Sequence, residues 1–202
     1  MVRIPALIRK IFFDIIWKIP GQTPSIYLTF DDGPGPELTP WILKTLESYK
    51  IKATFFCVGE NVEKYPELYN NIILGGHSTG NHTFSHINGW KSGVKEYIYD
   101  VEKAAKFINS KLFRPPYGRI RHLQKKALKK KYEIVMWNVL SKDYDQSLTE
   151  WEVLENVLNY ANPGSVVVFH DNVIVEEKLK FVLPKVIEHY LYKGYTFKKI
   201  SN

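Results

Sequence analysis

Short apolar runs alternate with longer amphipathic stretches along most of the chain. The runs are rich in Val, Ile and Phe, which is typical of buried strands. Most of the stretches between them space apolar residues three or four apart, as one face of a helix requires. This alternation predicts parallel strands joined by crossover helices. The predicted strands cover residues 26–30, 53–58, 76–81, 112–114, 134–137, 165–169 and 195–198.

The clearest helices lie between these strands, and several of them begin at Thr, Ser or Asn and end at Gly. Seven strands separated by helices predict an α/β fold, an incomplete (β/α) barrel of about seven parallel strands. We find no internal repeat or linker that divides the chain. The predicted helices cover residues 37–49, 61–74, 94–108, 122–130, 149–160 and 176–192.

Residues 1–20 differ from the rest of the chain, and Pro20-Gly21 is the clearest boundary. Pairs of Ile and Phe broken by Arg, Lys and Asp predict an amphipathic segment there. Its longest uncharged run is too short for a signal core or a bilayer span. We expect the segment to pack on the domain, or to rest on a membrane surface. Residues 21–202 are expected to form the one folded domain, in a cytoplasmic or membrane-peripheral protein.

The composition fits that single domain, with 202 residues, of which 45% are hydrophobic, and a formal net charge of +7. The densest basic cluster is at residues 125–131, and a solvated helix face is its simplest interpretation. Binding to nucleic acid or to an anionic membrane is the alternative, but no nucleic-acid signature accompanies the charge. The only cysteine, Cys57, lies in an apolar run and predicts a buried thiol.

Polar clusters follow most of the predicted strands, and in a parallel barrel these positions share one rim, where active sites are built. His82 and His86 are spaced so that a helical turn or a tight loop brings both to one metal ion. A carboxylate, from Asp31 or Asp32, would complete a three-ligand site with an open position, which is typical of catalytic zinc. A pair of ordinary surface histidines is the alternative.

Asp31 and Asp32 can have different roles, because the side chains of neighbouring residues at the end of a strand point to different sides. One can bind the metal while the other stays free as a base. A simple turn is the alternative, since Asp-Gly followed by Pro has strong turn chemistry. Arg114 would hold the free carboxylate ionised and oriented, or else would form a structural surface salt bridge.

Two further positions supply candidate groups for hydrolysis. Pro115-Pro116-Tyr117-Gly118 predicts a rigid backbone that aims a main-chain N–H at the pocket, with the ring of Tyr117 as a wall; a plain connector would look similar. His170 ends an apolar run, and a carboxylate such as Asp143 would raise its pKa for acid catalysis. A structural histidine satisfied by the same aspartate is the alternative.

Four motifs together resemble the polysaccharide deacetylases, the carbohydrate esterase family that includes chitin, chitooligosaccharide and peptidoglycan N-acetylglucosamine deacetylases. The resemblance runs from about Ile26 to Lys198, in the order and spacing of the family. The motifs are Thr29-Phe30-Asp31-Asp32-Gly33-Pro34, Asn81-His82-Thr83-Phe84-Ser85-His86, Arg114-Pro115-Pro116-Tyr117 and Phe169-His170-Asp171.

The resemblance implies a distorted (β/α) barrel, a divalent metal that is usually zinc, and an acetylated glycan or glycoconjugate as substrate. It implies that metal-activated water removes the N-acetyl group of N-acetylglucosamine units. The implied roles are metal ligation by Asp32, His82 and His86, base catalysis by Asp31, orientation of Asp31 by Arg114, oxyanion stabilisation by the main-chain N–H of Tyr117, protonation of the leaving amine by His170, orientation of His170 by Asp143, and a structural position for His77.

The chain departs from the family pattern in the pocket, which puts the substrate in doubt. Leu140 to Tyr144 stands where the family often has Asp-x-x-Asp-Trp, and Val168 replaces a usual leucine. An O-acetyl esterase or small-amide hydrolase with the same site is one alternative, and an idle barrel that binds a glycan or an anion is another. Trp90 follows the second histidine closely, where its ring would allow a sugar to stack. His122 and His189 are interpreted as exposed or packing residues.

Overall fold

A single parallel sheet forms the centre of the molecule. The computed structural model describes Val2 and residues 14–201. The sheet runs in the order β5-β4-β3-β2-β1-β7-β6, and β8 pairs with β1 outside this path. The strands are β1 (Ser25–Asp31), β2 (Thr54–Cys57), β3 (Ser78–Asn81), β4 (Leu112–Phe113), β5 (Glu133–Ile134), β6 (Val139–Leu140), β7 (Ser165–His170) and β8 (Thr196–Phe197).

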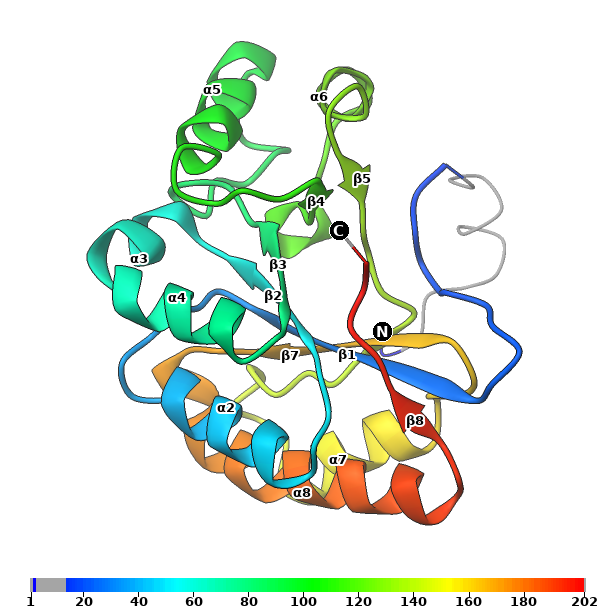
Figure 1. Ribbon diagram of the computed structural model, residues 1–202. Helices are drawn as coiled ribbons and strands as arrows, with labels where there is room; N and C mark the ends of the chain where they lie inside the picture. The colour runs from blue at the N-terminus through cyan, green and yellow to red at the C-terminus, as the bar shows by residue number, and fades with distance from the viewer. Residues whose placement is uncertain (1, 3–13, 202) are drawn as a thin grey trace.

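Helices cover the sheet and are longest on the side of β1 and β7. Figure 1 shows α2, α7 and α8 together below these two strands. Their packed faces meet β1 and β7 in the largest apolar cluster of the described residues. The helices are α2 (Thr39–Ser48), α3 (Gly59–Lys64), α4 (Pro66–Leu74), α5 (Val94–Ala104), α6 (His122–Leu128), α7 (Glu150–Leu158) and α8 (Glu176–Tyr192), with short 3₁₀ turns η1 (Pro116–Gly118) and η2 (Val173–Val175).

β1 is the central strand, and all seven of its residues are buried. It pairs in parallel with β2 and with β7, with Asp31 opposite Phe56 on one side and opposite His170 on the other. A strand that is buried on both faces is expected to have a nearly continuous run of apolar residues, and the sequence of β1 has this pattern. The register places Asp31 and His170 at the same end of the sheet.

The predicted incomplete (β/α) barrel is confirmed, and two details of the prediction are wrong. The helix predicted over 61–74 is two helices, α3 and α4, because Pro66 has no N–H to donate and Tyr65 before it leaves the helical region at φ −128° and ψ 58°. The strand β6 was missed, because two residues carry no detectable period. Asp143 therefore follows β6, not the strand predicted at 134–137.

The described part of the N-terminal segment packs on the domain. Ile15 and Trp17 are buried in a cluster with residues from β4, β5 and α5. Ile16 forms a parallel bridge with Val135, and Lys18 forms an antiparallel bridge with Ser165. This segment thus links the residue after the edge strand β5 to the start of β7. Residues 1 and 3–13 lie outside the described residues, so membrane contact through residues 1–20 stays a prediction.

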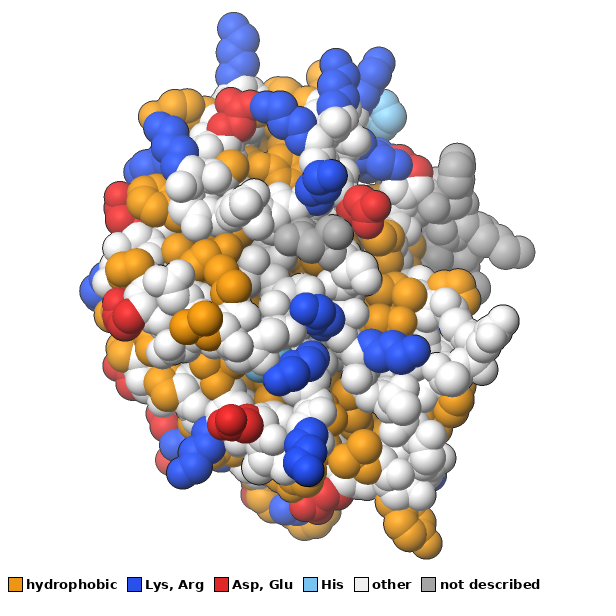
Figure 2. Space-filling model, in the orientation of Figure 1, with side chains coloured by type: hydrophobic (Ala, Val, Ile, Leu, Met, Phe, Trp, Pro, Cys, Tyr) orange, Lys and Arg blue, Asp and Glu red, His pale blue; other side chains and the backbone are white. Residues whose placement is uncertain are grey.

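The surface carries scattered basic side chains. Figure 2 shows Lys and Arg spread over this face, with several gathered over α5 and α6. Lys125 and Lys129 pair with Asp14, and Lys131 pairs with Glu102. This agrees with a solvated helix face. Among the described residues, no helix is both long enough and apolar enough to cross a bilayer.

Candidate active site and metal centre

The carboxyl ends of the parallel strands surround a pocket of about 500 Å³. Six of the eight predicted site residues line it. The other two, Arg114 and Asp143, are wholly buried behind it and contact Asp31 and His170. The lining residues are Asp31, Asp32, His82, His86, Tyr117, Arg119, Trp137, Leu140, Tyr144, Val168, His170, Asn172 and Ile174.

Asp32, His82 and His86 form the predicted three-residue cluster. One ligand atom from each lies within 4.8 Å of the others. The Nε2 atom of His86 is 3.2 Å from Asp32 Oδ1, and the Nε2 atom of His82 is 3.7 Å from it. Nδ1 of His82 is 2.7 Å from the carbonyl oxygen of Arg114, which can only accept, so Nδ1 carries the proton. The lone pair of Nε2 therefore faces Asp32.

The protonation states of Asp32 and His82 suit a metal cation. Burial lowers the pKa of His82 to about 4, against the opposing charges of Asp31 and Asp32, so the imidazole is neutral at neutral pH. Burial of Asp32 disfavours its charge, but a hydrogen bond from His86 and the nearby histidine charges hold its pKa well below the usual range. An ionised carboxylate and a neutral imidazole are both ligands that zinc and related divalent metals take in catalytic sites.

Two of the three candidate ligands, Asp32 and His86, have rare backbone conformations. Asp32 has φ 79°, His86 has φ 56°, and Tyr117 beside them has φ 60°. Left-handed φ at non-glycine residues is costly and persists where the surroundings impose it, often at functional sites. His82 and His86 therefore meet in a tight loop after β3, not on a helical turn. After Asp32, a Cβ on Gly33 would lie 2.2 Å from Asp171 Oδ2, so only glycine fits.

Arg114 holds the second carboxylate. Its Nη1 donates to Asp31 Oδ1 at 2.6 Å and to Thr29 Oγ1 at 2.8 Å. Its Nε and Nη2 donate to the carbonyl oxygens of Val135 and Met136. Because the guanidinium is wholly buried, the alternative of a surface salt bridge is wrong. Within the described chain, these hydrogen bonds leave Asp31 Oδ2 free.

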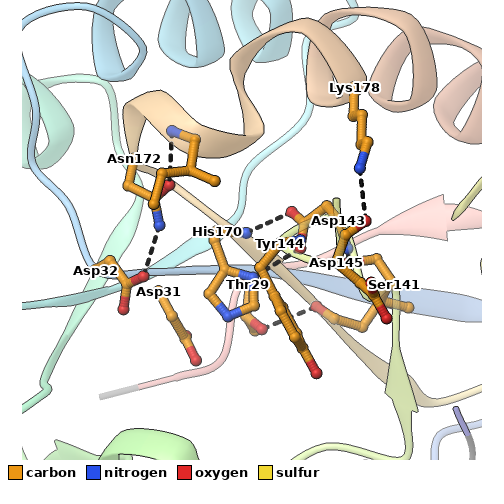
Figure 3. Close-up of polar contacts among 12 residues, drawn as sticks. Thr29, Asp31, Asp32, Ser141, Asp143, Tyr144, Asp145, His170, Asn172 and Lys178 are labelled. Carbon is orange, nitrogen blue, oxygen red and sulfur yellow. Dashed lines mark hydrogen bonds and ion pairs between the residues drawn. The ribbon is translucent and has the colours of Figure 1, made fainter. Parts of the chain in front are cut away.

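His170 and Asp143 form a second pair, at the ends of the neighbouring strands β7 and β6. Asp143 is wholly buried and accepts twice from His170, from ring Nδ1 at 2.7 Å and from the main-chain N–H at 2.8 Å. Figure 3 shows the ring of His170 between Asp143 on one side and Asp31 and Asp32 on the other. Burial alone would lower the pKa of His170, but the charge and hydrogen bond of Asp143, helped by Asp32 and Asp31, raise it to about 9. A cation bound to Asp32 would cancel part of that increase.

The aromatic side chains form the walls of the pocket. The Tyr117 hydroxyl lies 3.2 Å from His86 Nδ1, and the two rings pack with centroids 4.6 Å apart. The Tyr144 ring meets the His170 ring edge-on at 5.1 Å. The wall predicted for Tyr117 is thus present, whereas a role for its main-chain N–H stays a prediction. Leu140 and Val168, the other departures from the family pattern, also line the pocket.

Asn172 is a site residue that the sequence reasoning missed. Its amide donates to Asp32 Oδ2 at 2.8 Å, and its Oδ1 accepts from the N–H of Ile174 at the start of η2. Figure 3 shows this amide reaching Asp32 from the loop after β7. The hydrogen bond leaves Oδ1 of Asp32 to face the histidines. The only signal in the sequence was that Asn172 directly follows Phe169-His170-Asp171.

Replacement of Asn172 by alanine is expected to lower the affinity for a divalent metal by about 10–100-fold, the effect typical of losing an outer hydrogen-bond partner of a ligand. The reason is that Asp32 would lose the contact that fixes its rotamer. Competition with a chelator measures the affinity, and thermal unfolding reports any loss of the cap on η2. Asn71→Ala, on the exposed face of α4, is the matched control. Equal affinities in the two variants would contradict the role given to Asn172.

Comparison with known proteins gives one consistent family. The model of the family described as polysaccharide deacetylase matches residues 18–135. A peptidoglycan-N-acetylglucosamine deacetylase of Bacillus cereus is 40% identical over 158 residues, which cover 75% of this chain and 57% of that protein. A second one from the same species is 31% identical over 199 residues, covering 93% of this chain and 91% of the relative.

A solved structure agrees with these relatives. The crystal structure of the Bc1960 peptidoglycan N-acetylglucosamine deacetylase in complex with 4-naphthalen-1-yl-N-oxidanyl-benzamide has a TM-score of 0.88 to this chain at 33% sequence identity. The match covers 98% of this chain and 95% of the other. The likeness therefore extends over the whole described domain, including the rim that carries the pocket.

Proposed function

Because the chain belongs to the polysaccharide deacetylase family, a family of hydrolases, we propose that it removes the N-acetyl group from glycans containing N-acetylglucosamine, with a divalent metal held by Asp32, His82 and His86. The observation that carries this proposal is the pairing around one pocket. A carboxylate held by a buried arginine and an imidazole held by a buried carboxylate share one pocket with the three candidate metal-binding groups.

A divalent cation bound there would supply a Lewis acid for the acetyl carbonyl and would lower the pKa of a water molecule. Asp31 accepts the proton of the attacking water, because Arg114 fixes its carboxylate through Oδ1 while Oδ2 stays free. Asp31 and Asp32 leave the end of β1 in different conformations, with Asp32 alone in the left-handed region. The two carboxylates therefore serve different roles.

His170 donates a proton to the departing nitrogen. Asp143 fixes the ring through Nδ1, so Nε2 is the atom that faces the pocket and carries the transferable proton. This pair favours an amide over an ester as substrate, since an amine leaves only after protonation. Tyr117, Tyr144 and Trp137 narrow the pocket around the acetyl group.

Depletion and return of metal test the proposal directly. Protein treated with a chelator is expected to lose acetate release from N-acetylated chitooligosaccharides, and added Zn²⁺ is expected to restore it. The same protein should act far more slowly on O-acetylated xylan, where no amine departs. Preferred release from xylan would identify an O-acetyl esterase instead. Binding of glycan with no release from either substrate would identify an idle barrel and refute the proposal.

A further inference from the structure

Asp100 on α5 contacts the loop that carries both candidate histidine ligands, and the proposed chemistry gives it no role. This loop, residues 82–86, is called the histidine loop below. Oδ1 of Asp100 accepts hydrogen bonds from the main-chain N–H groups of Phe84 at 2.7 Å and Ser85 at 3.0 Å. Its Oδ2 accepts from the Ser85 hydroxyl at 2.8 Å. One carboxylate thus joins α5 to the middle of the histidine loop.

The backbone of the histidine loop has a conformation that needs such support. Thr83 has φ 65° and His86 has φ 56°, and the left-handed region is costly for residues other than glycine, above all for a β-branched residue such as threonine. The two N–H groups that Asp100 binds belong to the two residues between them. Successive main-chain N–H groups that converge on one point form a concave site for an anion. The Asp100 carboxylate occupies that site, so its hydrogen bonds favour the observed backbone.

The first half of the histidine loop has anchors besides Asp100. The main-chain N–H of His82 donates to the Cys57 carbonyl at 2.9 Å, and its ring donates to the Arg114 carbonyl at 2.7 Å. The first two residues of α3 donate their N–H groups to the carbonyls of residues 83 and 84, at 2.9 and 3.0 Å. His82 therefore keeps its position through β2, β4 and α3.

The second half of the histidine loop depends much more on Asp100. The His86 side chain is 28% exposed, and its ring contacts Asp32 and the Tyr117 hydroxyl, which belong to the site itself. Within the described chain, both hydrogen bonds that the neighbouring Ser85 donates go to Asp100. The position of His86 therefore follows from the backbone that Asp100 holds.

We propose that Asp100 is a positioning residue for the metal, because it holds the histidine loop so that Nε2 of His86 shares one cation with Asp32 and His82. This inference rests on the proposed function, since it presupposes that the three-residue cluster holds a divalent metal. The hydrogen bonds of Asp100 use main-chain and hydroxyl groups rather than ligand atoms, so they order the loop before a cation binds. A ligand that is ordered beforehand binds at a lower entropy cost.

Asp100→Ala is expected to lower the affinity for Zn²⁺ by about 10–100-fold, the effect typical of losing an outer partner of a metal ligand. The reason is that the cation itself must then order the histidine loop. Asp100→Asn should retain most of the affinity, because an amide oxygen still accepts from the N–H groups of Phe84 and Ser85. Chelator competition measures the affinity of each variant.

A double-mutant cycle with His86→Ala tests whether Asp100 acts through His86. Zn²⁺ affinity is measured for the native protein, for Asp100→Ala, for His86→Ala and for the double variant. If Asp100 acts by placing His86, its removal has no further effect once the imidazole is gone, and the factor between the last two variants should be about one. Equal factors in the two backgrounds would mean that Asp100 supports the fold in general and would overturn the proposal. An unchanged affinity in Asp100→Ala would overturn it as well.

Glu102→Ala is the matched control, because it removes another carboxylate of α5, one that pairs with Lys131 at the exposed surface. It should keep native affinity. Thermal unfolding of the metal-free proteins checks that each variant folds. If Asp100→Ala does not fold, Ser85→Ala takes its place in the cycle, since it removes just the hydrogen bond to Oδ2, and its smaller loss of affinity should also vanish in the His86→Ala background.

Acetate release by the native protein is measured separately, so that the two proposals can fail independently. Zn²⁺ affinities that follow the cycle in a protein that releases no acetate would support the role of Asp100 and refute the proposed function. Acetate release together with additive effects of Asp100→Ala and His86→Ala would do the reverse. A native protein that does not bind Zn²⁺ would overturn the role given to Asp100.

Discussion

Asp31→Asn is expected to keep a full equivalent of bound divalent metal while its kcat for acetate release falls by about 10²–10⁴-fold, the range found when a general base is removed. An amide can still accept the hydrogen bond from Arg114 at Oδ1, so the local structure should persist. It cannot take a proton from water. Asp31 is not one of the three metal-binding groups, so the metal should remain.

Metal content by elemental analysis and initial rates of acetate release check this result together. Glu47→Gln makes the same change of carboxylate to amide on the exposed face of α2 and should behave as the native protein does. Loss of metal from Asp31→Asn would mean that Asp31 is itself a ligand. Near-native kcat with metal bound would mean that another group serves as the base.

His82→Ala is expected to lose both metal and activity. His82 supplies a neutral imidazole to the cluster, and its removal leaves only Asp32 and His86. Metal affinity should therefore fall by more than the about 10–100-fold expected for the loss of an outer partner. The Arg114 carbonyl also loses the donor at Nδ1, which would cost about 1–3 kcal/mol of stability if no water replaces it.

Chelator competition measures the affinity, and thermal unfolding without added metal separates the structural cost from the effect of metal. His122→Ala, an exposed histidine on α6, is the matched control and should retain native affinity and activity. Together, Asp31→Asn and His82→Ala separate chemistry from metal binding. The assignment fails if His82→Ala binds metal as tightly as the control does.

The fold was predictable where the sequence pattern is long. β1 and β7 are apolar runs buried on both faces, and α8 spans the predicted residues Glu176–Tyr192. The two-residue strand β6 was not predictable, because its pairing with β7 depends on Val167 and Val168 rather than on its own residues. Pro66 did indicate a helix boundary, but the helical spacing of the apolar residues around it favoured a single helix.

The site was predictable to the extent that each group is part of a motif. The positions of Asp32, His82 and His86 and the contacts of Arg114 and Asp143 all follow the order of the strands, since residues after parallel strands converge at one rim. The buried carboxylate Asp171 was quoted in a motif but received no role. It accepts from Thr39 at 2.5 Å and occupies the space beside Gly33.

Contacts that depend on how separate loops meet in space have no motif in the sequence that would predict them. The hydrogen bond from Asn172 to Asp32 joins residues from the two neighbouring strand ends, and no spacing in the chain predicts it. The contact of Gly89 with the Arg119 carbonyl is similar, because it depends on how two loops meet. Such contacts follow from tertiary structure, which a single sequence encodes only indirectly.

The position of β1 in the sheet determines at which stage of folding the residues of the candidate site come together. Asp31 ends β1 and Asp32 directly follows it, yet β1 pairs with β7 and β8, which come much later in the sequence. Pairings between such distant segments form late, because loop closure must come first. A nascent chain released before β7 has emerged would hold Asp31 and Asp32 on a half-paired strand without His170. The candidate site is therefore completed only after β7 has been synthesised and has paired with β1.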